Sequence, residues 1–212
     1  MDKKEKKRII NRYNERFSQF GDDIRSLASG SEEHRRIRFE MLCGVGSLNN
    51  QSILDLGCGF GDLYGYLRAR GYLDVKYTGY DINPTLIEVA KKRYPQVPFS
   101  VKDIESEPFP SFDYILSTSS FNLRLLHDDN YHFIENILKI CFRHAKHGVA
   151  IDFLSSYVDY ESKEGFHYSP EKIFSIAKKI TKRVCLRHDY PLFEFCVYLY
   201  PDFRGWGEGD SQ

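Results

Sequence analysis

The sequence predicts an α/β protein with a doubly wound, seven-stranded sheet that is mostly parallel, ends in a C-terminal antiparallel hairpin and is capped by N-terminal helices. After Asn50, apolar runs of strand length alternate with helical patterns, which is the signature of βαβ units. The first of these runs leads directly into a glycine-rich turn. Near the C-terminus, two strand patterns are separated only by the short connection 189–191, which indicates a hairpin. A chain of 212 residues fits one core with a modest extension.

The first 45 residues are predicted to form the capping helices. From 2 to 20, apolar residues recur at near-helical spacing among charges, and Gly21 ends the pattern. A second helix is expected over about 32–43, with Ser29 or Ser31 as its N-cap. The lysine-rich start is interpreted as a solvated helix end.

Residues 46–204 are predicted to form the core. The parallel strands are expected at Ser52–Leu56, Lys76–Tyr80, Val97–Val101, Phe112–Ser117 and His147–Leu154. The helices between them are expected over about 61–70, 84–94 and 131–143, with Asn83 capping the second and the pair Asp128-Asp129 capping the third.

The last third departs from this alternation. A loop rich in Tyr, Asp and Ser spans 155–168 and precedes a helix that begins at Ser169-Pro170 and runs to about 179. Strands over about 181–188 and 192–200 then form the hairpin. The tail 205–212 is rich in Gly and acidic residues and is expected to be frayed.

Composition favours a small-molecule partner. Thirty basic and thirty acidic residues cancel, which removes the electrostatic footprint of a protein that binds nucleic acid or an anionic membrane. No apolar run approaches the roughly 18 residues of a membrane span and no secretory leader is recognisable, so we expect a cytoplasmic protein. The five cysteines contain no CxxC pair, so neither a disulfide framework nor a metal site is expected. A monomer and a homodimer both remain open.

One motif carries the functional hypothesis. The segment ILDLGCGFGD, residues 53–62, is a buried strand that continues into three glycines at alternate positions and then a helix. Glycines there permit a tight turn and let a ligand lie against backbone at a helix N-terminus, where free N–H groups point outward. In doubly wound sheets ligands bind beyond the carboxyl ends of the strands, and this turn occupies that edge. The motif therefore predicts a binding site.

An acidic residue, Asp81, ends the second strand about 20 residues after the glycines, where a carboxylate can accept both hydroxyls of a ribose. Nicotinamide dinucleotides use the same arrangement, but their fingerprint is GxGxxG, whereas this chain has GxGxG with Asp55 two residues before the first glycine. A carboxylate at Asp55 disfavours a pyrophosphate and favours a cationic amino group. A ligand with an ammonium group and a ribose fits better than a dinucleotide.

The segments LDLGCGFGDL, GYDINP, VKDIES and FDYILSTSSFN together resemble the four cofactor motifs of the class I S-adenosylmethionine-dependent methyltransferases, over roughly 52–154. The resemblance implies a Rossmann-like fold, S-adenosylmethionine as cofactor and methyl transfer as activity. It implies that the methionine part of the cofactor lies on Gly57, Cys58 and Gly59 with Asp55 near its amino group, the ribose on Asp81, the adenine between Ile82 and the pair Asp103 and Ile104, and the methionine end near Ser117 and Thr118.

Residues for the acceptor are less defined. Aromatic faces tolerate a sulfonium, which makes Tyr13 and Phe121 candidates for a lid. Arg38 is a candidate contact for an acidic substrate or the cofactor carboxylate, and Tyr157 lies in the loop expected to shape the substrate pocket. The candidates for a general base are His127, Asp152, His167 and His188, and the sequence does not choose among them.

We therefore expect methyl transfer to an oxygen or nitrogen atom of a small polar metabolite. One alternative is a nucleic-acid methyltransferase, for example one acting on RNA. Against it stand the zero net charge and the stretch 119–122, Ser-Ser-Phe-Asn, where amino-group DNA methylases carry [DNS]PP[YFW]. A second alternative is a partner or scaffold protein that binds the cofactor without catalysis. A dehydrogenase is the third.

Overall fold

The computed structural model describes residues 1–27 and 30–202. The helices in these ranges are α1 (Lys3–Phe20), the short 3-10 helix η1 (Ile24–Leu27), α2 (Glu32–Cys43), α3 (Asp62–Ala69), α4 (Pro84–Arg93), α5 (Asn130–His144) and α6 (Pro170–Ile180). The strands are β1 (Ser52–Leu56), β2 (Lys76–Asp81), β3 (Phe99–Val101), β4 (Phe112–Ser117), β5 (Ala145–Leu154), β6 (Arg183–Arg187) and β7 (Glu194–Tyr200).

The strands form one sheet in the order β3-β2-β1-β4-β5-β7-β6. The first five strands in this order pair in parallel, and β7 runs antiparallel to both β5 and β6. This confirms the predicted α/β class and the C-terminal hairpin. The chain moves outward in one direction from β1 through β2 to β3 and then returns to β4 on the other side of β1, so the sheet has its switch point between β1 and β4.

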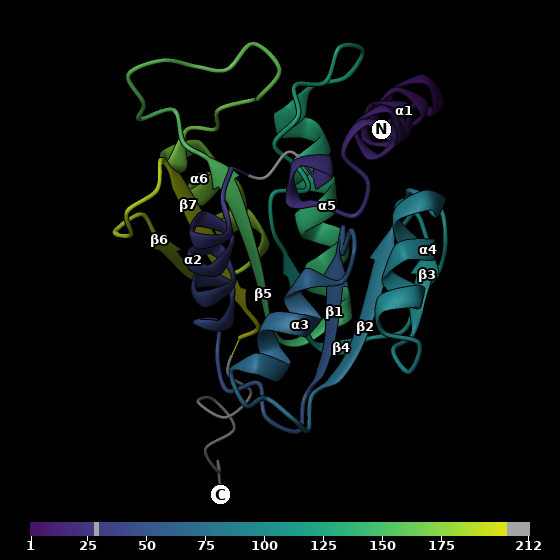
Figure 1. Ribbon diagram of the computed structural model, residues 1–212. Coiled ribbons are helices and arrows are strands. Elements are labelled where there is room, and N and C mark those ends of the chain that lie inside the picture. Colours follow the sequence, from purple (N-terminus) through teal and green to yellow (C-terminus); the bar gives the residue numbers. More distant parts are fainter. Residues whose placement is uncertain (28–29, 203–212) are drawn as a thin grey trace, which may run out of the picture.

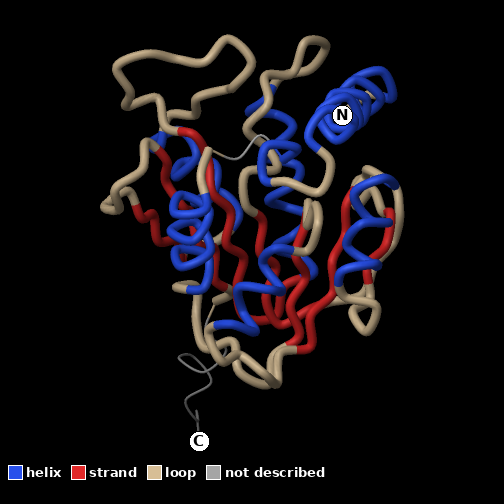
Figure 2. The backbone as a smooth tube through the Cα atoms, viewed as in Figure 1, coloured by secondary structure: helices blue, strands red, loops and turns tan. Residues whose placement is uncertain are grey.

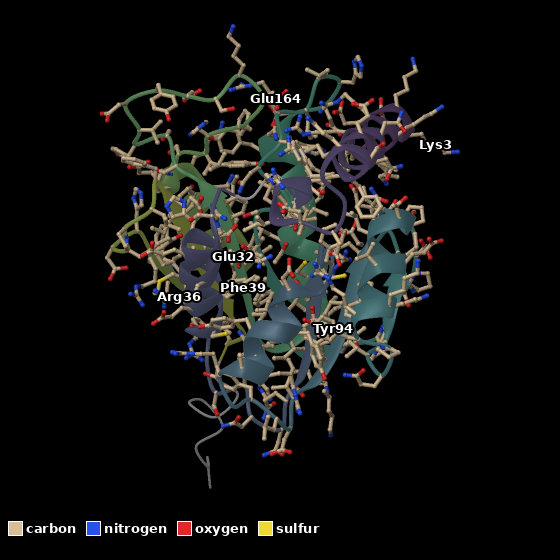
Figure 3. All side chains as sticks on the ribbon, viewed as in Figure 1. Lys3, Glu32, Arg36, Phe39, Tyr94 and Glu164 are labelled. Atoms are coloured by element: carbon tan, nitrogen blue, oxygen red, sulfur yellow. The ribbon has the colours of Figure 1, made fainter. Side chains whose placement is uncertain are left out.

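Helices cover both faces of the sheet (Figures 1 and 2). Helices α2, α3 and α4 pack on one face, while α5 and α6 pack on the other. Neighbouring residues of β1 serve the two faces in turn, with Ile53 in one apolar cluster and Leu54 in the other, both fully buried. Helix α2 is amphipathic, since Phe39 is buried against the sheet while Arg36 is exposed and pairs with Glu40 (Figure 3).

Predicted helix caps position the loops that follow the strands. The side chain of Asn83 accepts hydrogen bonds from the first turn of α4, that of Asp129 from α5, and that of Ser169 from α6. The N-cap of α2 is Ser31. The alternative cap Ser29 and the predicted tail 205–212 lie outside the described residues, as do positions 203 and 204 of the predicted core.

Some elements are shorter or longer than predicted. Strand β3 begins at Phe99, because the backbone N–H of Val97 turns back to Tyr94 rather than joining the sheet. Strand β6 begins at Arg183, because the hydroxyl of Thr181 donates to the Tyr200 carbonyl on β7 and accepts from the backbone N–H of Arg183. These differences do not alter the carboxyl edge of the sheet.

Helix α1 lies across the end of the sheet at which β1, β2 and β4 finish (Figure 1). Among the described residues, no helix is both long and apolar enough to cross a bilayer.

Candidate active site

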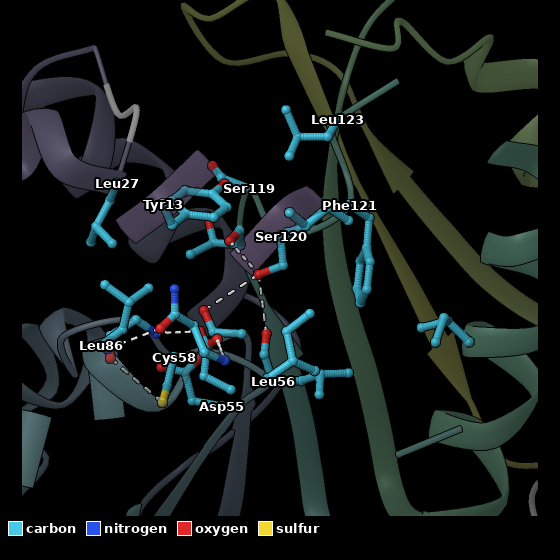
Figure 4. Close-up of a pocket in the computed structure, with 18 of the residues that line it drawn as sticks. Tyr13, Leu27, Asp55, Leu56, Cys58, Leu86, Ser119, Ser120, Phe121 and Leu123 are labelled. Carbon is cyan, nitrogen blue, oxygen red and sulfur yellow. Dashed lines mark hydrogen bonds between the residues drawn. The ribbon is translucent and has the colours of Figure 1, made fainter. Parts of the chain in front are cut away.

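A cavity opens at the carboxyl ends of β1, β2 and β4, between the sheet edge and α1 (Figure 4). Of the ten residues that the sequence assigned to the cofactor, nine line it: Asp55, Gly57, Cys58, Gly59, Asp81, Ile82, Asp103, Ile104 and Thr118. The tenth, Ser117, is fully buried, and its hydroxyl donates to the carbonyl of Leu56 at 2.7 Å. Ser117 therefore ties β4 to β1 and does not face the cavity.

The turn after β1 requires glycine. Gly57 has a φ of +75°, and a Cβ there would lie 2.0 Å from the hydroxyl oxygen of Ser120. The backbone N–H groups of Gly57 and Cys58 both donate to the carbonyl of Tyr80, at 2.7 and 3.1 Å. These two amides, which precede the N-terminus of α3, hold the turn against β2. At Gly57 and Gly59 a ligand can therefore contact the backbone directly, because no side chain covers it.

Asp55 presents an unused acceptor to the cavity. It is 2% exposed, and one carboxylate oxygen, Oδ2, accepts a hydrogen bond from the Tyr77 hydroxyl. The other, Oδ1, has no hydrogen-bond partner among the described residues. Burial raises the pKa of Asp55 to about 7, although the Tyr77 bond opposes the shift. A buried, unpaired oxygen fits the ammonium group of a methionine moiety.

Asp81 is held in place by backbone amides. Its Oδ2 accepts from Gly59 N–H at 3.0 Å and its Oδ1 from Asn83 N–H at 2.8 Å. Burial raises the pKa of Asp81, while these amides oppose the shift. Each oxygen can accept one more hydrogen bond, so the carboxylate can take a pair of ribose hydroxyls without moving.

Asp103 lies on the cavity wall and is engaged by α1. Lys6 forms a salt bridge to its Oδ2, and Ser106 donates to the same oxygen at 2.9 Å. Burial opposes ionisation of Asp103, but these hydrogen bonds outweigh it and lower the pKa. Ile82 and Ile104 also line the cavity.

Helix α1 forms the roof of the cavity. Glu5 is fully buried, and its Oε2 accepts from the backbone N–H groups of Leu126 and His127 at 3.1 and 3.2 Å. On the opposite side, Asn83 donates to Asn14 at 3.0 Å. The roof is therefore fastened to the loop after β4 and to the start of α4.

The roof, η1 and the β4–α5 loop give the cavity an apolar wall. Tyr13, Leu27, Phe121 and Leu123 surround it in Figure 4. Burial, with the charge of Asp81, raises the pKa of the Tyr13 phenol, so this hydroxyl stays neutral. Tyr13 and Phe121, the two candidates for a lid, thus both line the cavity.

The other two predicted acceptor contacts differ. Arg38 lines the cavity, but its guanidinium forms a bidentate pair with Glu194, at 2.7 Å from Nε and 2.6 Å from Nη2. Tyr157 is 61% exposed, lies away from the cavity and donates to Glu171 on α6. The loop after β5 therefore does not bring Tyr157 to the site.

The four candidate bases separate clearly. His127 and His188 are exposed and do not line the cavity. His167 is held between the Ser155 carbonyl, 2.8 Å from Nδ1, and the Ser162 N–H, 3.1 Å from Nε2, so it stabilises its own loop. Asp152 is 1% exposed and lies directly behind Thr118, whose hydroxyl donates to it. Among these four, the structure links only Asp152 to the cavity.

Glu5, Glu194 and Tyr77 hold other residues of the site in place. The sequence analysis did not identify them, although the first two carried a signal. Glu5 is the lone acidic residue in the run KKEKKR, and Glu194 opens an otherwise apolar strand. Tyr77 carried none, since an aromatic residue in a buried strand is ordinary core. Within the described ranges, no group of three or more His, Cys, Asp or Glu side chains is placed to hold a metal ion.

Comparison with known proteins gives consistent results. Residues 53–148 match the family model described as a methyltransferase domain. A Mycobacterium tuberculosis protein assigned as a methyltransferase is 32% identical over 153 residues, which cover 70% of this chain and 92% of that protein.

Solved structures share the fold. The magnesium protoporphyrin IX methyltransferase of Synechocystis PCC 6803, crystallised with SAH, superposes with a TM-score of 0.64 at 14% identity, covering 91% of this chain and 98% of that one. Human N-acetylserotonin methyltransferase, crystallised with S-adenosylmethionine (SAM), superposes with a TM-score of 0.58 at 18% identity, covering 89% of this chain and 61% of that one. Together with the relative at 32% identity and the cofactor motifs gathered around one cavity, these matches show that the chain belongs to the class I S-adenosylmethionine-dependent methyltransferases.

Proposed function

We propose that this methyltransferase transfers the methyl group of S-adenosylmethionine to an oxygen or nitrogen atom of a small molecule. The observation that carries the proposal is the roof formed by α1. Because Glu5 and Asn14 fasten α1 on both sides of the cavity, an acceptor has to fit beneath the helix. A folded RNA could reach this space only by flipping a nucleotide out of its stack, which costs unstacking energy.

The charges around the cavity favour a cationic cofactor. Asp55 and Asp81 face it directly, whereas the cationic side chains on its wall are engaged by other groups. Arg35 pairs with Asp62 and Arg38 with Glu194, and Lys102 donates to the Pro108 carbonyl. The potential at the carboxyl edge is therefore negative, which stabilises a sulfonium and an ammonium. In this arrangement Asp55 would hold the ammonium group, Asp81 the ribose and the glycine turn the methionine chain.

The bound cofactor supplies an activated methyl group, so the chain needs to align the acceptor, exclude water and remove a proton. The apolar wall of Tyr13, Leu27, Phe121 and Leu123 favours an acceptor with an apolar body and one polar reacting group. This refines the polar metabolite expected from composition. The names of two neighbours in the fold, a magnesium protoporphyrin IX methyltransferase and an N-acetylserotonin methyltransferase, indicate small acceptors in those proteins.

Two measurements test the proposal. Calorimetric titration should show binding of S-adenosylmethionine and of S-adenosylhomocysteine, and no response to NAD. Cofactor labelled in its methyl group is then incubated with the protein and either a low-molecular-weight metabolite extract or total RNA. We expect label in the metabolite fraction alone. Label in RNA would instead support the nucleic-acid alternative, and binding without transfer to either would support the scaffold alternative.

A further inference from the structure

The carboxylate at the end of β5 reaches the cavity only through another side chain. Thr118 donates its hydroxyl proton to Oδ2 of Asp152, and Ser119 donates its backbone N–H to Oδ1 at 2.6 Å. Thr118 and Ser119 both line the cavity, whereas Asp152 is 1% exposed. Ser119 has a φ of +56°, a conformation that a serine rarely adopts, and the bond to Asp152 helps to hold it there.

Within the described residues, no ion pair to Asp152 is found. Arg38 on α2 is the nearby positive charge, and its Nε and Nη2 donate to Glu194 on β7. The other titratable groups that face Asp152 are Tyr190, in the β6–β7 connection, and Cys196 on β7, and neither supplies positive charge. Two buried carboxylates thus share one guanidinium. Burial, reinforced by Glu194 and opposed by Arg38, raises the pKa of Asp152 to about 7.

The direction of the Thr118 hydrogen bond restricts what can bind beside it. A threonine hydroxyl has one proton, and while Asp152 is ionised that proton is directed at its carboxylate. Only the lone pairs of the oxygen remain for the cavity. A group that contacts Thr118 from the cavity side must therefore donate a hydrogen bond, as a neutral O–H or N–H does and as a carboxylate or an ether oxygen does not.

We propose that the methyl acceptor of this enzyme is a neutral hydroxyl or amine that donates its proton to Thr118, and that Asp152 receives a proton through Thr118 during transfer. This proposal rests on the proposed function. As the acceptor atom bonds to the methyl carbon, the methyl–sulfur bond breaks and its electron pair stays on sulfur. The acceptor proton passes to Oγ1 of Thr118, and the original proton of Thr118 passes to Oδ2 of Asp152. One positive and one negative charge disappear together, so the buried site finishes the step neutral.

Asp152 is accordingly a positioning and proton-holding residue, and Thr118 is the group that touches the acceptor. The assignment has a consequence that needs no identified acceptor. If Asp152 faces the reacting sulfur through Thr118, the sulfonium of S-adenosylmethionine should favour the ionised carboxylate, and the neutral thioether of S-adenosylhomocysteine should not.

Calorimetric titration of the full chain at pH 7, repeated in phosphate and in Tris, measures the protons released on binding. Because Asp152 titrates near pH 7, we expect S-adenosylmethionine to release up to about half a proton per site more than S-adenosylhomocysteine. The ammonium group acts on Asp55 alike in both ligands, so its effect cancels in the difference, and any effect of the sulfonium on Asp55 remains in Asp152→Asn. The difference should shrink in Asp152→Asn and persist in the control Asp189→Asn, an exposed carboxylate in the β6–β7 connection.

The affinity for S-adenosylhomocysteine reports whether the variant is folded, and we expect Asp152→Asn to keep it within about threefold. An unchanged difference in Asp152→Asn, or equal proton release by the two ligands in the unmodified protein, would overturn the proposal while leaving the methyltransferase function intact. Failure of both ligands to bind would overturn the proposed function instead.

Discussion

The two halves of the cavity present their carboxylates differently. On the cofactor half, Asp55 on β1 and Asp81 on β2 face the cavity directly and keep acceptor capacity for a ligand. On the acceptor half, Asp152 on β5 lies one layer back, behind the hydroxyl of Thr118. A carboxylate that faces the cavity suits a ligand group that keeps its charge or hydroxyls during the reaction. A carboxylate behind a hydroxyl suits a group that gives up a proton.

Gly57→Ala should disable the cofactor half. The added Cβ would meet Ser120 at 2.0 Å and would force a strained φ, so we expect affinity for S-adenosylhomocysteine to fall by more than about 100-fold. Gly71→Ala is the matched control, since Gly71 has a φ of +85° but nothing within 4 Å of its Cβ position. Both variants should lose roughly 1–2 kcal/mol of unfolding free energy through strain. Equal cofactor affinity in the two variants would contradict our placement of the methionine chain.

Asp81→Ala should weaken binding of the same ligand by about 10- to 100-fold, which corresponds to roughly 1–3 kcal/mol for hydrogen bonds to a charged group. The exposed Asp159→Ala serves as the control. Calorimetric titration measures both. Unchanged affinity in Asp81→Ala would mean that the ribose lies elsewhere.

Asp55→Asn should separate stability from binding. The pKa of Asp55 is raised from its ordinary value of 3.8 to about 7 in the folded protein. Between about pH 4 and pH 7 the folded state therefore keeps a proton on Asp55 that the unfolded chain has lost. The ligand-free protein therefore loses stability as pH rises from about 4 to 7. Asn carries no charge at any of these pH values, so at pH 8 we expect the variant to be more stable by roughly 2 kcal/mol while binding the cofactor less tightly.

Chemical denaturation at pH 5 and pH 8 checks this prediction. Asp152 contributes a slope of the same sign, so the pH dependence should shrink in Asp55→Asn without disappearing. A variant that is less stable than the unmodified protein at pH 8 would show that the Tyr77 bond, rather than the desolvated charge, dominates at this position.

The same contrast explains how much could be predicted from the sequence. The cofactor half is built from one strand–turn–helix unit and the end of the next strand, so spacing along the chain alone places Asp55, Gly57 and Asp81 together. The fold class followed for the same reason, since βα alternation is a local pattern. Even here, the engagement of the Gly57 and Cys58 amides by Tyr80 depends on strand pairing and was not foreseen.

The acceptor half depends on contacts between distant parts of the chain. Asp152 is 34 residues from Thr118, and Glu194 is 156 residues from Arg38. No local pattern reports such pairs, which is why the sequence left Asp152 among four candidates for the base. The roof also depends on contacts between distant residues, because Glu5 accepts hydrogen bonds from amides that are 121 and 122 residues away.

Thr118 allows the acceptor half to be tested with the smallest change. Thr118→Val keeps the shape of the side chain and removes the hydroxyl, whereas Thr118→Ser keeps the hydroxyl and removes a methyl group. If the hydroxyl relays a proton, methyl transfer into the metabolite extract should fall about tenfold in the Val variant, equivalent to about 1.4 kcal/mol in the barrier, and should recover in the Ser variant. Affinity for S-adenosylhomocysteine should stay the same in both, because Thr118 acts on the acceptor. If Thr118 only packs against the cofactor, both variants should lose affinity and neither should show a selective loss of rate, and the contrast between direct and covered carboxylates would then have no catalytic meaning.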